Sequence, residues 1–559
     1  MALRSREKFI DVLQYCQTGI ASDLRNVLNF SLDGDDIVIL KRNKCLKNGD
    51  FLGVVRKWKT NRAKTIGGLS FKSIHPFHAS VLAVTQEHDI ALTLDRKQIY
   101  FTAILEVLNH GQEYGQVSGS PTNTKQNACI NVDYLFDNSD WATFSVSHLR
   151  SLLLSEHVAA LLNATGCQVK YIQHVIHDQL KKSMNDYGIS SETYKATQDE
   201  NNEQQLVALK EEIHEILCGS GYLEDIPQAE GKNTNVDQSG TMSKLLREEK
   251  SPVLINLRRF LSENDLLDQF DRIINIVEFT EGNARLHKLT VLVHHMKSIK
   301  QVYDFLVHIV PQERSFCSQT VDIGVKIIEK LNKHSVKQIH IVHGSVSHQL
   351  GKKQILKAGD LLSHRIQEMR RASFMKYGDN IQGEFFAFFL ECVLNNELNL
   401  DMSQLDETQT NMDRRGGVFV MYNYARLSNL FRKFETAVHE GFYQPLPDVS
   451  TLDFSLLREE QEWELMFNYV LVYPSLVQNC IEMLRNNKSK AVIHTHKVCQ
   501  FLQDLSRALS SYYSHFHVLG EPHDHLLPVM YCRIYLLKSI QQVMHNALSL
   551  LSITPISLM

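Results

Sequence analysis

The sequence lacks paired cysteines and long apolar runs. Its ten cysteines stand singly, and none forms a Cys-x-x-Cys pair. This excludes a zinc ribbon or a disulfide framework as the basis of the fold. No stretch reaches the roughly 18 apolar residues of a membrane helix, and charges at the N-terminus interrupt any signal-peptide core. We therefore expect a chain of the cytosol or nucleus, with a cytoplasmic location as the prediction.

Excess charge of one sign is also missing from the chain as a whole. The net charge of −4 argues against a simple polyanion binder. The average hides a basic segment at 41–72, where ten lysines and arginines accompany one acid, Asp50. Trp58 and Phe71 lie in the same segment, and cations mixed with stackable rings are typical of RNA contacts. A solvated positive face is the alternative. The cations predicted to contact RNA are Lys41, Arg42, Arg56, Lys57, Lys59 and Arg62.

Composition and turn residues predict three domains. Residues 1–135 form an N-terminal mixed α/β domain with strands at 37–40 and 89–94 and a helix beginning near Tyr100. The second domain spans 136–410 and the third 411–559.

The second domain shows the pattern of a parallel sheet. Residues 288–296 predict a buried strand, 297–310 a helix and 337–346 another strand. This order is typical of a βαβ unit. A polar, low-complexity stretch at about 197–243 predicts a flexible insertion.

Long amphipathic helices characterise the third domain. Residues 496–516 place apolar side chains at i, i+3, i+4 and i+7, and 533–553 repeat the arrangement. A helical bundle is expected.

Four blocks in this domain carry a family resemblance. GGVFVMYNYARLSNLFRKFE at 416–435, with later blocks at 463–482, 499–521 and 532–559, resembles the DALR anticodon-binding domain of arginyl-tRNA synthetases. The resemblance implies a bundle that binds the anticodon stem and loop of tRNA. On the helix that would face the anticodon, it implies contacts from Tyr422, Asn423, Tyr424 and Arg426. The alternative is that the two tyrosines are core aromatics.

The resemblance extends to the first signature of the class I synthetases. The stretch HLRSLLLSEHV resembles the helix that follows a His-x-Gly-His turn, whose histidines stabilise charge on the ATP phosphates. Here Ser145 and Ser147 replace the first histidine and the glycine, and only His148 remains. One lost donor typically costs about 2.7–4 kcal/mol of transition-state stabilisation. We interpret Ser147 as a helix N-cap and not as a nucleophile.

The second signature of the family, Gly-Lys-Met-Ser followed by a basic residue, is degenerate as well. Lys352 matches it, but Leu356 stands at the functional basic position. Loss of both signatures predicts a chain with no catalytic residues for amino-acid activation. No P-loop or dinucleotide fingerprint is present, and histidines spaced i, i+2 define no metal site, so we predict no cofactor and no metal.

The predicted fold class is therefore α/β plus all-α. A degenerate class I synthetase-like Rossmann domain would precede a DALR helical bundle. The resemblance implies a non-catalytic protein that recognises arginine tRNAs and acts as specificity factor for a methyltransferase forming 3-methylcytidine in the anticodon loop. A protein-interaction scaffold without RNA binding and a divergent arginyl-tRNA synthetase remain as alternatives.

Overall fold

A computed structural model gives the fold. It describes residues 12–28, 37–55, 71, 74, 77–84, 89–116, 126–136, 144–174, 176, 178–186, 189–194, 200–224, 253–280, 283–298, 303–332, 336–344, 346–349, 353–355, 357–360, 400–401, 417–485, 490–491 and 493–555.

The N-terminal unit is a four-stranded antiparallel sheet with a helix on either side of it in the sequence. The strand order is β1-β2-β4-β3. Its elements are α1 (Val12–Leu28), β1 (Ile37–Lys41), β2 (Phe51–Val55), β3 (Ala79–Val84), β4 (Ile90–Leu94) and α3 (Arg96–His110). The predicted strands at 37–40 and 89–94 are confirmed. The predicted helix is present but begins earlier, at Arg96, because the Asp95 side chain accepts a hydrogen bond from Gln98 N and caps it.

The central unit is a five-stranded parallel sheet in the order β15-β11-β10-β5-β6. The strands are β5 (Asn127–Val132), β6 (Gln168–Tyr171), β10 (Phe305–Pro311), β11 (Lys337–His343) and β15 (Lys490–Ala491). Helix α4 (Val146–Asn163) connects β5 to β6, and α9 (Ser315–Asn332) connects β10 to β11. Because these two connections leave β5 and β10 in opposite directions, the strand order reverses between β5 and β10. A ligand of such a sheet binds at the carboxyl ends of the strands at this point.

The βαβ unit exists, but two of its predicted segments were wrong. Residues 288–296 belong to a helix, α8 (Ala284–Ser298), and the predicted helix at 297–310 contains strand β10. Helix α8 buries Leu286, Leu289 and Val293, which are spaced three and four residues apart. A short apolar run fits either period, so only the packing of α8 against α9 settles which one the chain adopts.

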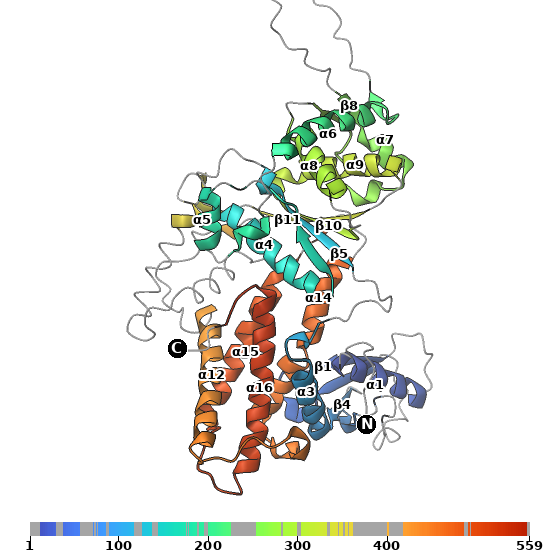
Figure 1. The fold of residues 1–559 in the computed structure, drawn as a ribbon. Helices are drawn as coiled ribbons and strands as arrows, with labels where there is room; N and C mark the ends of the chain where they lie inside the picture. The colour runs from blue at the N-terminus through green and yellow to red at the C-terminus, as the bar shows by residue number, and fades with distance from the viewer. Residues whose placement is uncertain are drawn as a thin grey trace, which may run out of the picture.

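The predicted insertion at about 197–243 was partly wrong. Helix α6 (Glu200–Cys218) lies within it and buries Leu209, Ile213 and Leu217 against a second core formed with α8 and α9. A small antiparallel sheet adjoins this core. Its strands are β7 (Leu223–Glu224), β8 (Val253–Asn256) and β9 (Ile276–Phe279), and α7 (Leu257–Glu263) lies between β8 and β9 in the chain. Figure 1 shows these elements at the end of the molecule farthest from the C-terminal helices.

The predicted boundary at residue 135 also differs from the structure. Strand β5 precedes it in sequence, yet β5 pairs with β6 and β10 and so belongs to the central sheet. Successive residues of β5 point to opposite faces of the sheet and lie in different cores. Ile130 packs with α4 and the C-terminal helices, whereas Cys129 packs with the α8–α9 side. The sheet is therefore covered on both faces.

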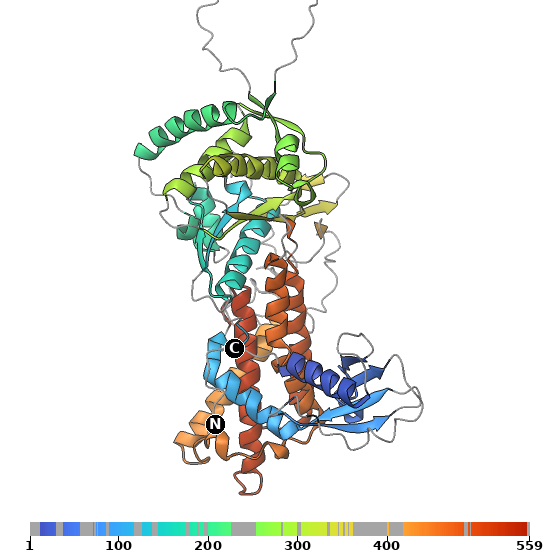
Figure 2. The same cartoon turned by 90° about the vertical axis from the view of Figure 1, so that its right-hand side faces the viewer.

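The C-terminal unit is helical, as predicted. It comprises α12 (Gly417–His439), α13 (Glu460–Leu465), a π-helical turn at Met466–Val470, α14 (Tyr473–Arg485), α15 (Thr495–His515) and α16 (Leu527–Leu550). The two expected apolar stripes are buried along α15 and α16. Figures 1 and 2 show α12, α15 and α16 side by side below the central sheet, with the N-terminal unit against their lower half.

A buried tryptophan joins the N-terminal unit to the helices. The Trp463 indole Nε1 donates to Asp50 Oδ1 at 2.7 Å, and its ring packs edge-on against Tyr100 at 5.4 Å. Burial raises the pKa of Asp50 above its ordinary value, although three hydrogen bonds and the Arg96 charge oppose the rise. A buried carboxylate bonded across the boundary fixes the relative position of the two units. Within the described part of the chain, no helix is both long and apolar enough to cross a membrane.

Candidate nucleic-acid interface

The first turn of α4 is a capping box closed by its own side chains. Ser145 has an extended backbone, its Oγ accepts from His148 N at 3.3 Å, and its own N donates to His148 Nδ1 at 3.0 Å. The N-cap is therefore Ser145, and the prediction of Ser147 as N-cap was wrong. The His148 ring also packs edge-on against Tyr134, with ring centres 4.2 Å apart. The surviving signature histidine is thus used for local structure.

Ser147 has a different structural role. Its Oγ accepts a hydrogen bond from Val346 N at 2.8 Å, at the start of β12 (Val346–Gln349). The neighbouring Ser151 Oγ lies 2.6 Å from His343 Nε2. Burial holds the pKa of His343 down at about 3, so its imidazole is neutral near pH 7. These bonds attach the start of α4 to the end of β11.

A buried ion pair occupies the carboxyl end of β5. Asp133 follows the last residue of that strand, and both of its oxygens accept from Lys288 Nζ at 2.9 Å. Both side chains are at most 5% exposed, and Arg314 Nη1 lies 3.6 Å from Asp133. This is the point where the strand order reverses, so the usual ligand crevice of the fold holds charges that already neutralise one another. The sequence offered no signal for this pair, because Lys288 lay in a segment predicted as a strand.

The second signature lies mostly outside the described residues, including Lys352 and Leu356. The next residues are described, and they pair with the first signature. Ser145 and Lys357 form an antiparallel bridge, and Ala358 N donates to Phe144 O at 2.9 Å. The residues that follow the second signature are therefore bonded through their backbones to Ser145 of the first signature and to Phe144 before it.

Helix α12 places its four predicted contact residues in different environments. Tyr422, Tyr424 and Arg426 are partly exposed, whereas Asn423 is fully buried and donates from Nδ2 to Phe419 O at 2.8 Å. The helical period places Asn423 on the same side as Val420 and Leu427, three residues before it and four after it, and both of these are buried. Asn423 is thus unavailable to a ligand in this structure. The two tyrosines are not fully buried core aromatics.

Arg426 makes the clearest ring contact on this face. Its guanidinium lies 3.8 Å from the centre of the Tyr513 ring on α15. Burial raises the pKa of Tyr513, the Arg426 charge opposes the rise, and nearby Tyr422 adds to it. An arginine whose guanidinium lies over an aromatic ring retains N–H donors for a phosphate or a base edge. Tyr513 was missed at the sequence level, because only the packing of α15 on α12 brings it to Arg426.

The basic segment is only partly described. Lys41 turns toward the helical unit: its Nζ donates to Asn43 and Asn468 and lies 4.7 Å from the Phe467 ring centre. Burial lowers the pKa of Lys41 to about 8. Lys41 therefore joins the two units, and its role as a cation that contacts RNA stays a prediction. Arg42 is partly exposed. Arg56, Lys57, Lys59 and Arg62 lie outside the described residues.

Comparison with known proteins identifies the C-terminal unit. Residues 420–559 match the model of the DALR anticodon binding domain. The chain is 37% identical over 216 residues to the DALR anticodon-binding domain-containing protein 3 of Danio rerio, covering 36% of this chain and 38% of that protein. It is 33% identical over 262 residues to the protein of the same name from Mus musculus, covering 45% and 48%. The matched region thus spans less than half the length of these curated relatives.

Solved structures show the same fold. The Thermus thermophilus arginyl-tRNA synthetase superposes with a TM-score of 0.58 at 13% identity, over 98% of this chain and 100% of that one. The Plasmodium falciparum arginyl-tRNA synthetase gives 0.57 at 12% identity, over 98% and 99%. The predicted fold class, a synthetase-like α/β fold followed by a DALR helical domain, is therefore confirmed.

Proposed function

We propose that this chain, which carries a DALR anticodon binding domain at 420–559, is a non-catalytic tRNA-binding protein. In the finer form of the proposal it recognises arginine tRNAs in the cytoplasm. There it would act as specificity factor for a methyltransferase that forms 3-methylcytidine in the anticodon loop. The arginine identity, the location and the methyltransferase rest on the family resemblance alone.

The stacked Arg426–Tyr513 pair is the observation that carries tRNA binding. An anticodon loop presents unpaired bases and closely spaced phosphates, and proteins bind such loops by stacking and by charge-assisted hydrogen bonds. Arg426 offers both on one partly exposed side chain, and its guanidinium lies over the Tyr513 ring. Tyr422 lies beside the pair on α12 and adds a second ring.

The hydrogen bonds at the start of α4 support the absence of amino-acid activation. An activating site must bind the adenine ring and phosphates of ATP against this turn. Here Ser147 Oγ already accepts from Val346 N, and His148 Nδ1 accepts from Ser145 N. A ligand that used Ser147 Oγ or His148 Nδ1 would have to replace the bond that the atom already makes, and loss of that bond would leave its backbone donor without a partner.

Co-purification with RNA tests the proposal. The full chain is purified from its native cells at moderate salt, and the bound RNA is sequenced. Enrichment of one or a few arginine tRNAs is expected. If the folded protein carries no tRNA, the scaffold alternative replaces the proposal.

Two further assays separate the finer parts. Pyrophosphate exchange with arginine and ATP should give no signal above a chain-free control, and a signal would make the chain a divergent synthetase. Adding the chain to a 3-methylcytidine methyltransferase and an arginine tRNA transcript should increase methylation of that transcript over a serine tRNA transcript. Equal methylation of both would remove the specificity role and leave tRNA binding intact.

A further inference from the structure

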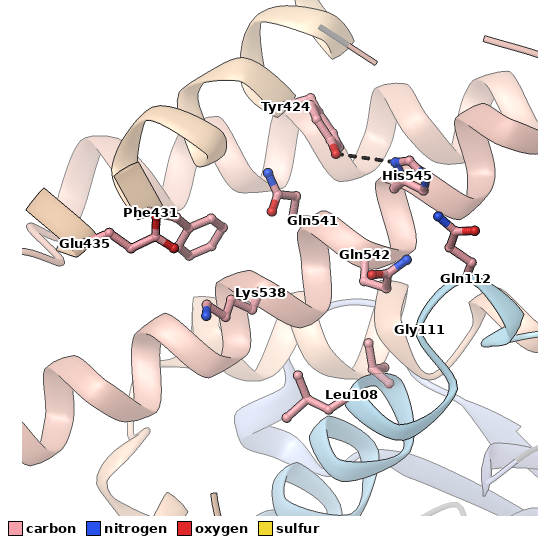
Figure 3. A pocket seen from close by; sticks show the side chains of 11 residues that line it. Leu108, Gly111, Gln112, Tyr424, Phe431, Glu435, Lys538, Gln541, Gln542 and His545 are labelled. Atoms are coloured by element: carbon pink, nitrogen blue, oxygen red, sulfur yellow. Dashed lines mark hydrogen bonds between the residues drawn. The ribbon is translucent and has the colours of Figure 1, made fainter. Parts of the chain in front are cut away.

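A hollow of about 420 Å³ lies where α3 meets the C-terminal helices. Three elements form it: the end of α3 with residues 111–112, the middle of α12, and the middle of α16. Figure 3 shows Tyr424 and His545 facing one another across the upper wall and Leu108 and Gly111 on the opposite side. Its volume lies within the roughly 300–1,000 Å³ of ordinary ligand sites.

Side-chain amides dominate the polar lining. Gln541 Nε2 donates to Ser428 Oγ at 2.8 Å, and Gln542 Nε2 donates to Asn546 Oδ1 at 2.8 Å. These bonds orient both amides and use one N–H of each, so that each side chain keeps its carbonyl Oε1 to accept from a bound group and one N–H to donate. Gln112 adds a third amide from the opposite wall.

Rings and alkyl groups complete the site. The Tyr424 phenol lies 3.4 Å from His545 Nδ1, and burial raises the Tyr424 pKa, which keeps the phenol neutral. Val107 and Leu108 supply an apolar wall. Among the described residues that line the hollow, Lys538 and Glu435 are the only Lys, Arg, Asp or Glu residues, and their opposite charges make a phosphate cluster a poor fit.

The wall formed by the end of α3 and residues 111–112 is held in place by α16. Asn546 Nδ2 donates to Gly111 O at 2.9 Å and to Tyr114 O at 3.1 Å. Gly115 has a φ of +82°, and a Cβ on it would lie 2.6 Å from the Tyr473 ring, so only glycine allows this close approach. The segment that carries Gln112 is therefore fixed against the helices before any ligand binds.

We propose that this hollow binds one unpaired nucleobase with an exocyclic amino group, that is adenine, cytosine or guanine. The inference rests on the proposed RNA-binding function and deepens it. The amide carbonyls of Gln541 and Gln542 accept from the amino group, and the Tyr424 and His545 rings pack against the base. Uracil has no exocyclic amino group and can offer these carbonyls only its ring N3–H.

Four variants and a set of short RNAs test the site. Gln541→Leu removes the amide from one wall, and Leu108→Trp fills the hollow from the other, at a side chain that is already 41% exposed. Gln541→Glu keeps the accepting oxygens. Gln500→Leu on the exposed face of α15 is the matched control. Circular dichroism and thermal melting confirm that each full-length variant is folded.

Fluorescence anisotropy then measures binding of fluorescein-labelled pentanucleotides of adenine, cytosine or uracil, and of an arginine tRNA transcript. The wild type, Gln541→Glu and Gln500→Leu should prefer the adenine or cytosine probe over uracil by about tenfold. Gln541→Leu and Leu108→Trp should lose that preference. Equal binding of the three probes by the wild type, or an unchanged preference in both pocket variants, overturns the site.

The tRNA titration keeps the two proposals distinguishable. Wild-type binding of tRNA without base preference refutes the pocket and leaves the proposed function standing. Base preference without tRNA binding refutes the proposed function and retains the pocket. Binding of neither probe refutes both.

Discussion

Replacing Lys288 with methionine tests whether the crevice at the end of β5 is closed by an internal ion pair. The ammonium makes two hydrogen bonds of 2.9 Å to Asp133, and both side chains are almost fully buried. Methionine keeps the length and the apolar part of the side chain but removes the charge. It therefore leaves a carboxylate without its principal partner.

Removing one partner of a buried ion pair typically costs about 3–5 kcal/mol, because the remaining charge stays desolvated. Arg314 lies 3.6 Å from Asp133 and is 25% exposed, so it can offset part of this loss. We expect Lys288→Met to lower the free energy of unfolding by about 3 kcal/mol. The double variant Lys288→Met with Asp133→Asn should recover most of that loss, since no charge then remains buried.

Urea unfolding followed by circular dichroism measures these differences, with both single variants and the double variant compared as a cycle. Lys297→Met is the matched control, because Lys297 lies on α8 like Lys288 but forms an exposed ion pair, with Glu212 of α6. That pair should contribute less than about 1 kcal/mol. A loss below about 1 kcal/mol for Lys288→Met, or a double variant as unstable as the single one, refutes the ion pair as the group that closes the crevice.

Two other predictions concern RNA affinity and pH. Arg426→Ala should weaken binding of an arginine tRNA transcript by about tenfold, because the guanidinium over the Tyr513 ring is lost. Arg432→Ala, on the exposed face of the same helix, should weaken binding less. Equal losses for the two variants in filter binding would remove the special role of Arg426. Burial lowers the pKa to about 3 for His174, His308 and His343 and to about 4 for His157 and His295. Because the unfolded chain takes up these protons near pH 6.5 and the folded chain does not, stability is fully present above that pH and falls toward pH 4, by up to about 1.4 kcal/mol per pH unit for each histidine. His343→Phe should reduce this slope in urea titrations between pH 6.5 and 4, and an unchanged slope would contradict the neutral state of His343.

Local patterns predicted the helical domain well. The stripes on α15 and α16 recur at helical spacing over more than 20 residues, and such long patterns fit one period only. The prediction for the α8 segment failed because nine mostly apolar residues fit a strand as well as a helix. The prediction for the α6 segment failed because the polar composition of its first half conceals the three apolar residues of its second half, which pack on α8 and α9.

The candidate sites divide in the same way. Replacement of the signature residues by Ser145 and Ser147 is visible in the sequence, and so is Arg426 as a candidate contact residue. What those serines bond to is not visible, because Val346 lies 199 residues from Ser147. The same holds for the fate of Lys41, whose partner Asn468 is 427 residues away.

The sequence alone thus determined the long helices α15 and α16, which family the C-terminal blocks resemble and which signature residues are replaced, since each depends on residues close together in the chain. Only the tertiary structure decided that Lys288 neutralises Asp133, that Tyr513 supports Arg426 and that α3, α12 and α16 enclose an amide-lined hollow. Each of these contacts joins separate elements, and their side chains meet only when the chain has folded.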